Sequence, residues 1–111
     1  IAQLPEDKKV GHFYLVAPWF TLKPLDSESE AIAKPWITNP INSEQVTKIS
    51  QGIECLFSDN DQYVPLQKNV KIFQNEYNAN TQIFSKRGHF SAEESLTEIP
   101  ELLGIIKRTI V

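Results

Sequence analysis

Methionine is absent from this 111-residue sequence, even at its first position. Enzymatic removal of an initiator methionine is disfavoured before a residue as large as Ile1, so this absence indicates a piece of a longer protein. The opening residues, Ile1 to Pro5, are typical of the last turn of a helix that Pro5 stops. We therefore expect the chain to be a fragment of a longer protein.

Cysteine is almost as scarce, since Cys55 is the one cysteine in the sequence. A single cysteine cannot form a disulfide within the chain. Because Cys55 lies inside the apolar run of residues 53–57, we expect it to serve as a small buried hydrophobic side chain. The scarcity of cysteine fits a reducing, cytoplasmic setting.

Several functional classes lack the features that they require. Two histidines and one cysteine, without ligand spacing, predict no metal site. The sequence has no glycine-rich phosphate loop, so we expect no nucleotide cofactor. A net charge of −3 and a pI near 5.3 argue against nucleic-acid binding. No apolar run approaches the roughly 20 residues that span a bilayer, so no membrane association is expected.

The nucleophile elbow of serine hydrolases, Gly-x-Ser-x-Gly, is also missing. The nearest approach is Lys-Ile-Ser-Gln-Gly at residues 48–52, which lacks the first glycine. It also runs from a predicted helix into a predicted strand, whereas an elbow runs from strand into helix. We therefore do not expect Ser50 to be a catalytic nucleophile.

The pattern of apolar residues predicts strands alternating with helices. Strands are expected at residues 10–16, 53–57 and 81–84, and helices at 43–50 and 66–77. A last helix is expected to bury Ile99, Leu102, Leu103, Ile106 and Ile110. Gly52 is expected to end the helix at 43–50. Such alternation implies a parallel sheet, so we predict an α/β fold with three layers, α/β/α.

Residues 17–40 form the least regular part of the sequence, with four of the seven prolines and both tryptophans. A long excursion of this kind is often a lid or a binding loop, here with a short helix at 27–34. Trp19 follows the carboxyl end of the first predicted strand and is a candidate substrate-binding residue. The alternative is that the tryptophans fill a small secondary core.

An acidic turn, Ser-Asp-Asn-Asp-Gln-Tyr-Val-Pro at residues 58–65, follows the second predicted strand. A carboxylate there can accept a hydrogen bond from histidine Nδ1 and fix its tautomer. Asp59 and Asp61 compete for this role. Val64 precedes Pro65 and is held extended, which shapes the turn just beyond Asp61 and favours Asp61. The alternative is that these side chains only cap the following helix.

A histidine turn, Lys-Arg-Gly-His-Phe at residues 86–90, follows the third predicted strand. Gly88 allows a sharp bend that brings His89 over the sheet edge, where an imidazole can act as a general base. The alternative is an incidental loop histidine. If the two turns form a site, an Asp61 oxygen should lie about 2.6–3.2 Å from a His89 ring nitrogen. His12, at a strand start, is expected to be structural.

These paired turns resemble the small α/β-hydrolase family of serine hydrolases of the YdeN and retinoblastoma-binding protein nine type. The resemblance extends to Tyr-Leu-Val-Ala at 14–17, Ala-Glu-Glu at 92–94 and Ile-Pro-Glu-Leu-Leu at 99–103, and so to nearly the whole chain. It implies that residues 1–111 are the carboxyl-terminal part of a single α/β-hydrolase domain and contain the last three strands of the family's sheet. It also implies that Asp61 is the triad acid and His89 the triad base, while the serine precedes Ile1 in the missing amino-terminal half.

The resemblance implies a parent enzyme that hydrolyses carboxylic esters or similar small acyl compounds, with no cofactor. The expected partners are the acyl substrate and the amino-terminal half of the same domain. The chain alone should not catalyse by this route. An alternative is a non-catalytic protein-interaction domain, in which residues 17–40 would bind a protein partner. A phosphate-binding lobe is disfavoured by the lack of a glycine-rich loop.

Overall fold

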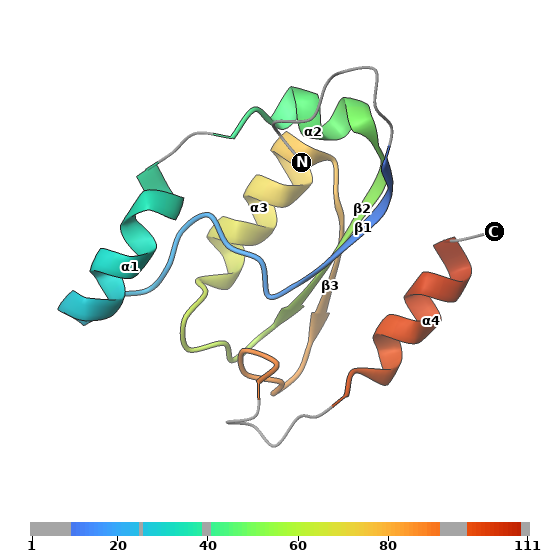
Figure 1. The fold of residues 1–111 in the computed structure, drawn as a ribbon. Helices are drawn as coiled ribbons and strands as arrows, with labels where there is room; N and C mark the ends of the chain where they lie inside the picture. Colours follow the sequence, from blue (N-terminus) through green and yellow to red (C-terminus); the bar gives the residue numbers. More distant parts are fainter. Residues whose placement is uncertain (1–9, 25, 39–40, 92–97, 110–111) are drawn as a thin grey trace.

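A three-stranded parallel sheet forms the centre of the protein, in a computed structural model that describes residues 10–24, 26–38, 41–91 and 98–109. The strands stand in the order β1 (Val10–Val16), β2 (Ser50–Ser58) and β3 (Asn80–Phe84). Helices α2 (Ser43–Ile49) and α3 (Leu66–Tyr77) lie on one side of the sheet, and α4 (Pro100–Thr109) lies on the other (Figure 1). This arrangement confirms the predicted α/β/α fold.

The main core lies between β2 and α3. Alternate residues of β2, Ile53, Cys55 and Phe57, pack against Val70 and Phe73 of α3. Cys55 is fully buried, as expected, and its burial raises the pKa of the thiol to about 12. The thiol therefore stays protonated and acts as a small apolar side chain.

Helix α4 contacts strand β1 on the opposite face of the sheet. The hydroxyl groups of Thr109 and of Tyr14 on β1 are hydrogen-bonded, and Ile105 is buried. The prediction that Leu103 is buried was wrong, because its side chain is 56% exposed. Leu103 precedes Ile105 by two residues, about 200° around a helix, so the two side chains cannot share one face.

Two predicted helix ends also differ from the structure. Helix α1 (Ser27–Thr38) continues past Pro35, although the predicted helix stopped at residue 34. Helix α2 ends at Ile49, and Gly52 lies inside β2 instead of ending that helix. The His12 side chain packs over Gly52, where a Cβ atom would lie 2.6 Å from His12 Nε2. Gly52 is thus needed for close packing between two strands.

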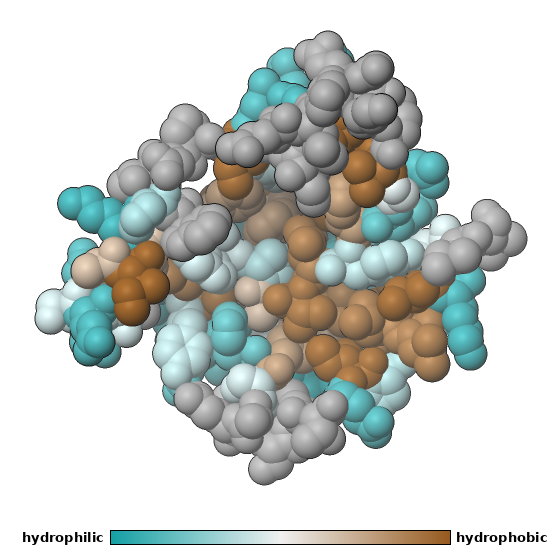
Figure 2. Space-filling model, in the orientation of Figure 1, coloured by the Kyte–Doolittle hydropathy of each residue, from teal (hydrophilic) through white to brown (hydrophobic). Residues whose placement is uncertain are grey.

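Strand β1 has a hydrogen-bonded neighbour on one side only within the described ranges. Six of its seven residues are half-buried, and Phe13 and Leu15 reach the core cluster. Figure 2 shows apolar residues gathered in the centre and right of this face, where Figure 1 places β1 and α4.

Residues 92–94, which contribute to the family resemblance, lie outside the described part of the chain. None of the described helices is long and apolar enough to cross a membrane.

Candidate active site

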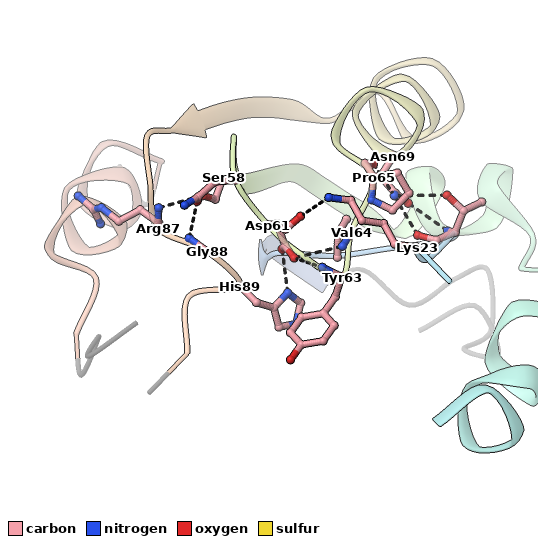
Figure 3. Close-up of polar contacts among 12 residues, drawn as sticks. Lys23, Ser58, Asp61, Tyr63, Val64, Pro65, Asn69, Arg87, Gly88 and His89 are labelled. Atoms are coloured by element: carbon pink, nitrogen blue, oxygen red, sulfur yellow. Dashed lines mark hydrogen bonds and ion pairs between the residues drawn. The ribbon is translucent and has the colours of Figure 1, made fainter. Parts of the chain in front are cut away.

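Asp61 and His89 meet at the carboxyl edge of the sheet, after β2 and after β3. His89 Nδ1 lies 2.8 Å from Asp61 Oδ2, which confirms the predicted distance (Figure 3). The Asp61 side chain is 3% exposed, whereas the His89 side chain is 32% exposed. The carboxylate is therefore buried, and the imidazole is partly open to solvent.

The Asp61 carboxylate is held by the backbone of its own turn. Its Oδ1 accepts hydrogen bonds from the backbone N–H groups of Tyr63 at 2.8 Å and Val64 at 3.1 Å. These bonds fix the side chain so that Oδ2 faces His89. The capping alternative is contradicted, because the N-cap of α3 is Pro65 and has no side-chain cap. Asp61 therefore shapes the turn before α3 without capping the helix.

The histidine turn requires unusual backbone conformations. Lys86, Gly88 and Phe90 all have left-handed φ angles, of 55°, 55° and 54°. The predicted bend at Gly88 is confirmed, and a glycine takes this conformation at little cost. Lys86 and Phe90 carry side chains and are strained there by about 1 kcal/mol or more each. Contacts from neighbouring segments must therefore hold this turn in place.

Part of this support comes from the first three residues of the acidic turn. Asp59 Oδ1 accepts the N–H of Lys86 at 2.9 Å. Ser58 Oγ accepts the N–H of Arg87 at 2.9 Å, and Asn60 Oδ1 accepts the N–H of Gly88 at 2.8 Å. The Asp59 side chain thus binds a backbone N–H group of the histidine turn and does not contact His89 in place of Asp61. Asp61, and not Asp59, is therefore the carboxylate beside His89.

Helix α4 supports the histidine turn from the opposite side. Arg87 Nη1 donates to Glu101 Oε1 at 3.2 Å, and the second nitrogen, Nη2, forms an ion pair with Oε2. The hydrogen bond to Arg87 lowers the pKa of Glu101, and that to Glu101 raises the pKa of Arg87. The guanidinium also lies over the Phe84 ring, with 5.4 Å from Cζ to the centroid. Arg87 therefore ties α4 to the end of β3.

The buried amide of Asn69 joins the start of the 17–40 excursion to α3. Its Oδ1 accepts the N–H groups of Phe20 at 2.7 Å and Thr21 at 3.1 Å. Its Nδ2 donates to the carbonyl groups of Thr21 and Pro65. Sequence reasoning missed Asn69. Asn69 could have been identified from its position next to Val70, on the apolar face of the predicted helix at 66–77. A buried amide on that face needs hydrogen-bond partners.

Lys23 connects the same excursion to the acidic turn. Its Nζ donates to the Asp61 carbonyl oxygen at 2.7 Å, and its backbone N–H donates to the Tyr63 carbonyl at 2.8 Å. The Tyr63 ring meets the His89 ring edge-on, with 5.4 Å between centroids. Lys23 and Tyr63 thus lie beside the Asp61–His89 pair, and no sequence pattern marked either of them as part of the site.

The other candidate residues take different places. Trp19 follows the carboxyl end of β1 and is half-buried, and its role toward a substrate stays a prediction. His12 stacks beside Tyr14, with ring centroids 6.1 Å apart, on the strand that begins at the far edge of the sheet. The structure therefore brings Asp61 and His89 together and leaves His12 away from them. In the described ranges, no group of three or more acidic, histidine or cysteine side chains could hold a metal ion.

The pair has the geometry of a general base with its orienting acid. An ionised carboxylate accepts a hydrogen bond, so Asp61 favours the His89 tautomer that carries its proton on Nδ1. In that tautomer Nε2 has a free lone pair and can accept a proton from a hydroxyl group or water. The catalytic roles of the two residues stay predictions.

Comparison with known proteins finds a solved structure of similar fold. No family model matches the sequence, and no curated protein matches it. The crystal structure of the ydeN gene product from B. subtilis is similar, with a TM-score of 0.78 and 17% identity. The match covers 93% of this chain and 53% of that one, so this chain spans about half its length. The match confirms the sequence resemblance at the level of the fold.

Proposed function

We propose that this chain supplies the acid and the base of a Ser-His-Asp hydrolase whose serine lies outside it. The observation that carries the proposal is the 2.8 Å contact between His89 Nδ1 and the buried Asp61 carboxylate. The two side chains come from turns at the ends of neighbouring parallel strands, where open α/β sheets place their active sites. The proposed substrates are carboxylic esters or similar small acyl compounds.

The reaction would proceed in two proton-coupled halves. His89 Nε2 takes the serine proton as the serine oxygen attacks the acyl carbonyl, and the protonated ring then gives that proton to the leaving alcohol. Water attacks the acyl-serine in the second half, with His89 again taking and returning the proton. Asp61 holds the ring and stabilises its charge in both halves. Trp19 is proposed to contact the acyl group.

The serine is proposed to come from an amino-terminal half of the same domain. The matched B. subtilis structure supports this, because its chain is about twice as long as the matched region. The β1 strand supports it too, since its outer edge has no neighbouring strand in the described ranges. A parallel strand paired there would bring its carboxyl end to the same edge as Asp61 and His89.

A serine-directed fluorophosphonate probe tests the proposal on the full natural protein that contains this sequence. We expect covalent labelling of a serine outside residues 1–111, and hydrolysis of short p-nitrophenyl esters. His89→Ala and Asp61→Asn should slow both reactions. Asp59→Asn is the matched control, because it changes a carboxylate two positions away that binds the Lys86 backbone. This control should keep most of the activity.

Two results would contradict the proposal. The first is a folded natural protein that neither reacts with the probe nor hydrolyses any ester in a panel of acyl lengths. Such a protein would fit the alternative, a non-catalytic interaction domain with a hydrolase-like fold. The second is labelling that persists at the wild-type rate in His89→Ala, which would place the base elsewhere.

A further inference from the structure

Four consecutive residues of the acidic turn contact four consecutive residues of the histidine turn. Asp61 binds His89 through its side chain, whereas Ser58, Asp59 and Asn60 accept backbone N–H groups from residues 87, 86 and 88. All four distances lie between 2.8 and 2.9 Å. The proposed reaction uses only the contact between Asp61 and His89, so the three contacts to backbone N–H groups have no role in it.

Ser58 and Asn60 are additionally joined to each other. The Ser58 hydroxyl donates to Asn60 Oδ1 at 2.9 Å, and the same Asn60 oxygen accepts the N–H of Gly88. Ser58 is 1% exposed at the end of the central strand, so its hydroxyl is fixed by the rigid sheet. The pair thus runs from β2 to the backbone of Arg87 and Gly88 as one connected set of bonds.

We infer that the Ser58–Asn60 pair positions His89 against Asp61. The N–H of Gly88 belongs to the residue directly before His89, so the bond from Asn60 limits the movement of the His89 backbone. Gly88 has a left-handed φ of 55° between two strained residues, Lys86 and Phe90, and no hydrogen bond within a helix or strand holds it there. The strand end therefore fixes the distance between the carboxylate and the ring.

Asp59 offers a matched comparison within the same turn. Its bond to the Lys86 N–H is 2.9 Å long and resembles the Asn60 bond in chemistry. It reaches the loop three residues before His89, next to the end of β3, whereas Asn60 reaches it one residue before His89. If both bonds only stabilised the loop, loss of either one should affect His89 to the same extent. A positioning role makes the Asn60 bond far more important for His89.

The test measures His89 directly in the full natural protein and its variants. The Nδ1–H proton of a histidine bonded to a buried carboxylate gives a far-downfield NMR signal, which we expect in the wild type. Asn60→Ala and Ser58→Ala should broaden or shift this signal, and Asn60→Asp should restore it because it keeps an acceptor oxygen. Asp59→Ala should leave the signal unchanged.

The kinetic arm of the test rests on the proposed function. We expect Asn60→Ala to lower kcat roughly 10- to 100-fold with little change in KM, because a small displacement of a catalytic group costs this much. Asp59→Ala should stay within about twofold of the wild type. If the protein hydrolyses no ester, the NMR arm still tests the positioning role.

Three outcomes would overturn the inference. One is a Nδ1–H signal unchanged in both Asn60→Ala and Ser58→Ala. Another is an equal change in Asp59→Ala, which would indicate general support of the loop. The third is an Asn60→Asp variant that remains as impaired as Asn60→Ala although circular dichroism shows both to be folded.

Discussion

Replacing Asp61 by asparagine tests the proposed site with the least structural change. The asparagine oxygen can keep both hydrogen bonds that Oδ1 now accepts, from the N–H groups of Tyr63 and Val64. The asparagine amide nitrogen then takes the place of Oδ2, 2.8 Å from His89 Nδ1. Two donors cannot share a hydrogen bond, so His89 must move its proton to Nε2 to accept the new one.

The expected size of the effect follows from this tautomer change. With the proton on Nε2, the ring presents a donor where the serine proton should be received, and general-base catalysis fails. An orienting aspartate of this kind contributes up to about 10⁴-fold to turnover, or about 5.5 kcal/mol at 1.36 kcal/mol for each tenfold. Stability should change much less, because both turn hydrogen bonds remain.

The tautomer can be measured without any substrate. Selective ¹⁵N labelling of histidine separates the protonated ring nitrogen from the unprotonated one by chemical shift, and His89→Gln assigns the signals. We expect a proton on Nδ1 in the wild type and on Nε2 in Asp61→Asn, in the full natural protein. A wild-type ring already protonated on Nε2, or unchanged ester hydrolysis in the variant, would refute the assignment of Asp61.

Three further predictions concern stability. Asn69→Ala should lower the free energy of unfolding, measured by urea titration, by about 3 kcal/mol, because two N–H groups and two carbonyls lose a buried partner. The control Gln74→Ala loses only an exposed side-chain hydrogen bond and should change the free energy of unfolding little. The hydrogen bond to Arg87 lowers the pKa of Glu101 from 4.5, so Glu101 should contribute its full share of the folding stability above pH 4.5. This stability should be lost as the pH falls through the lower pKa of the folded state, and Glu101→Gln should remove this part of the pH dependence. Cys55, with its pKa raised to about 12, should react with thiol reagents only after unfolding, and labelling at the rate of a free thiol under native conditions would disprove its burial.

The order of strands and helices and the meeting of Asp61 with His89 could be predicted from the sequence. Alternating apolar runs imply a parallel sheet, and in such a sheet every strand ends at the same edge. Turns after neighbouring strands therefore lie together, whatever their separation in the sequence. Asp61 and His89 are 28 positions apart, and both this argument and the family resemblance predicted that they would meet.

Contacts that depend on side-chain geometry could not be predicted in this way. Asn69 binds Phe20 and Thr21, 49 and 48 positions earlier, and nothing in the local pattern of α3 identifies the segment that its amide joins. Gly52 looks like a helix stop until the His12 ring is placed over it. Leu103 fits an apolar helix pattern, but the phase of α4 against the sheet depends on packing. Each of these features depends on a neighbour that is distant in the sequence.

The edge of β1 that has no neighbouring strand in the described ranges leads to a prediction about the 111 residues in isolation. In the described ranges β1 pairs only with β2, so one row of its N–H and C=O groups has no strand beside it. Phe13 and Leu15 pack against the core cluster yet stay half-buried. Unpaired edges with apolar side chains recruit other chains, and a domain of this size buries only a modest core. We therefore expect the isolated chain to associate or aggregate, and to become monodisperse when an amino-terminal half of the same protein is added. Sedimentation velocity over a range of concentrations, combined with thermal unfolding, measures this. A concentration-independent monomer with one cooperative transition would show that the β1 edge needs no partner.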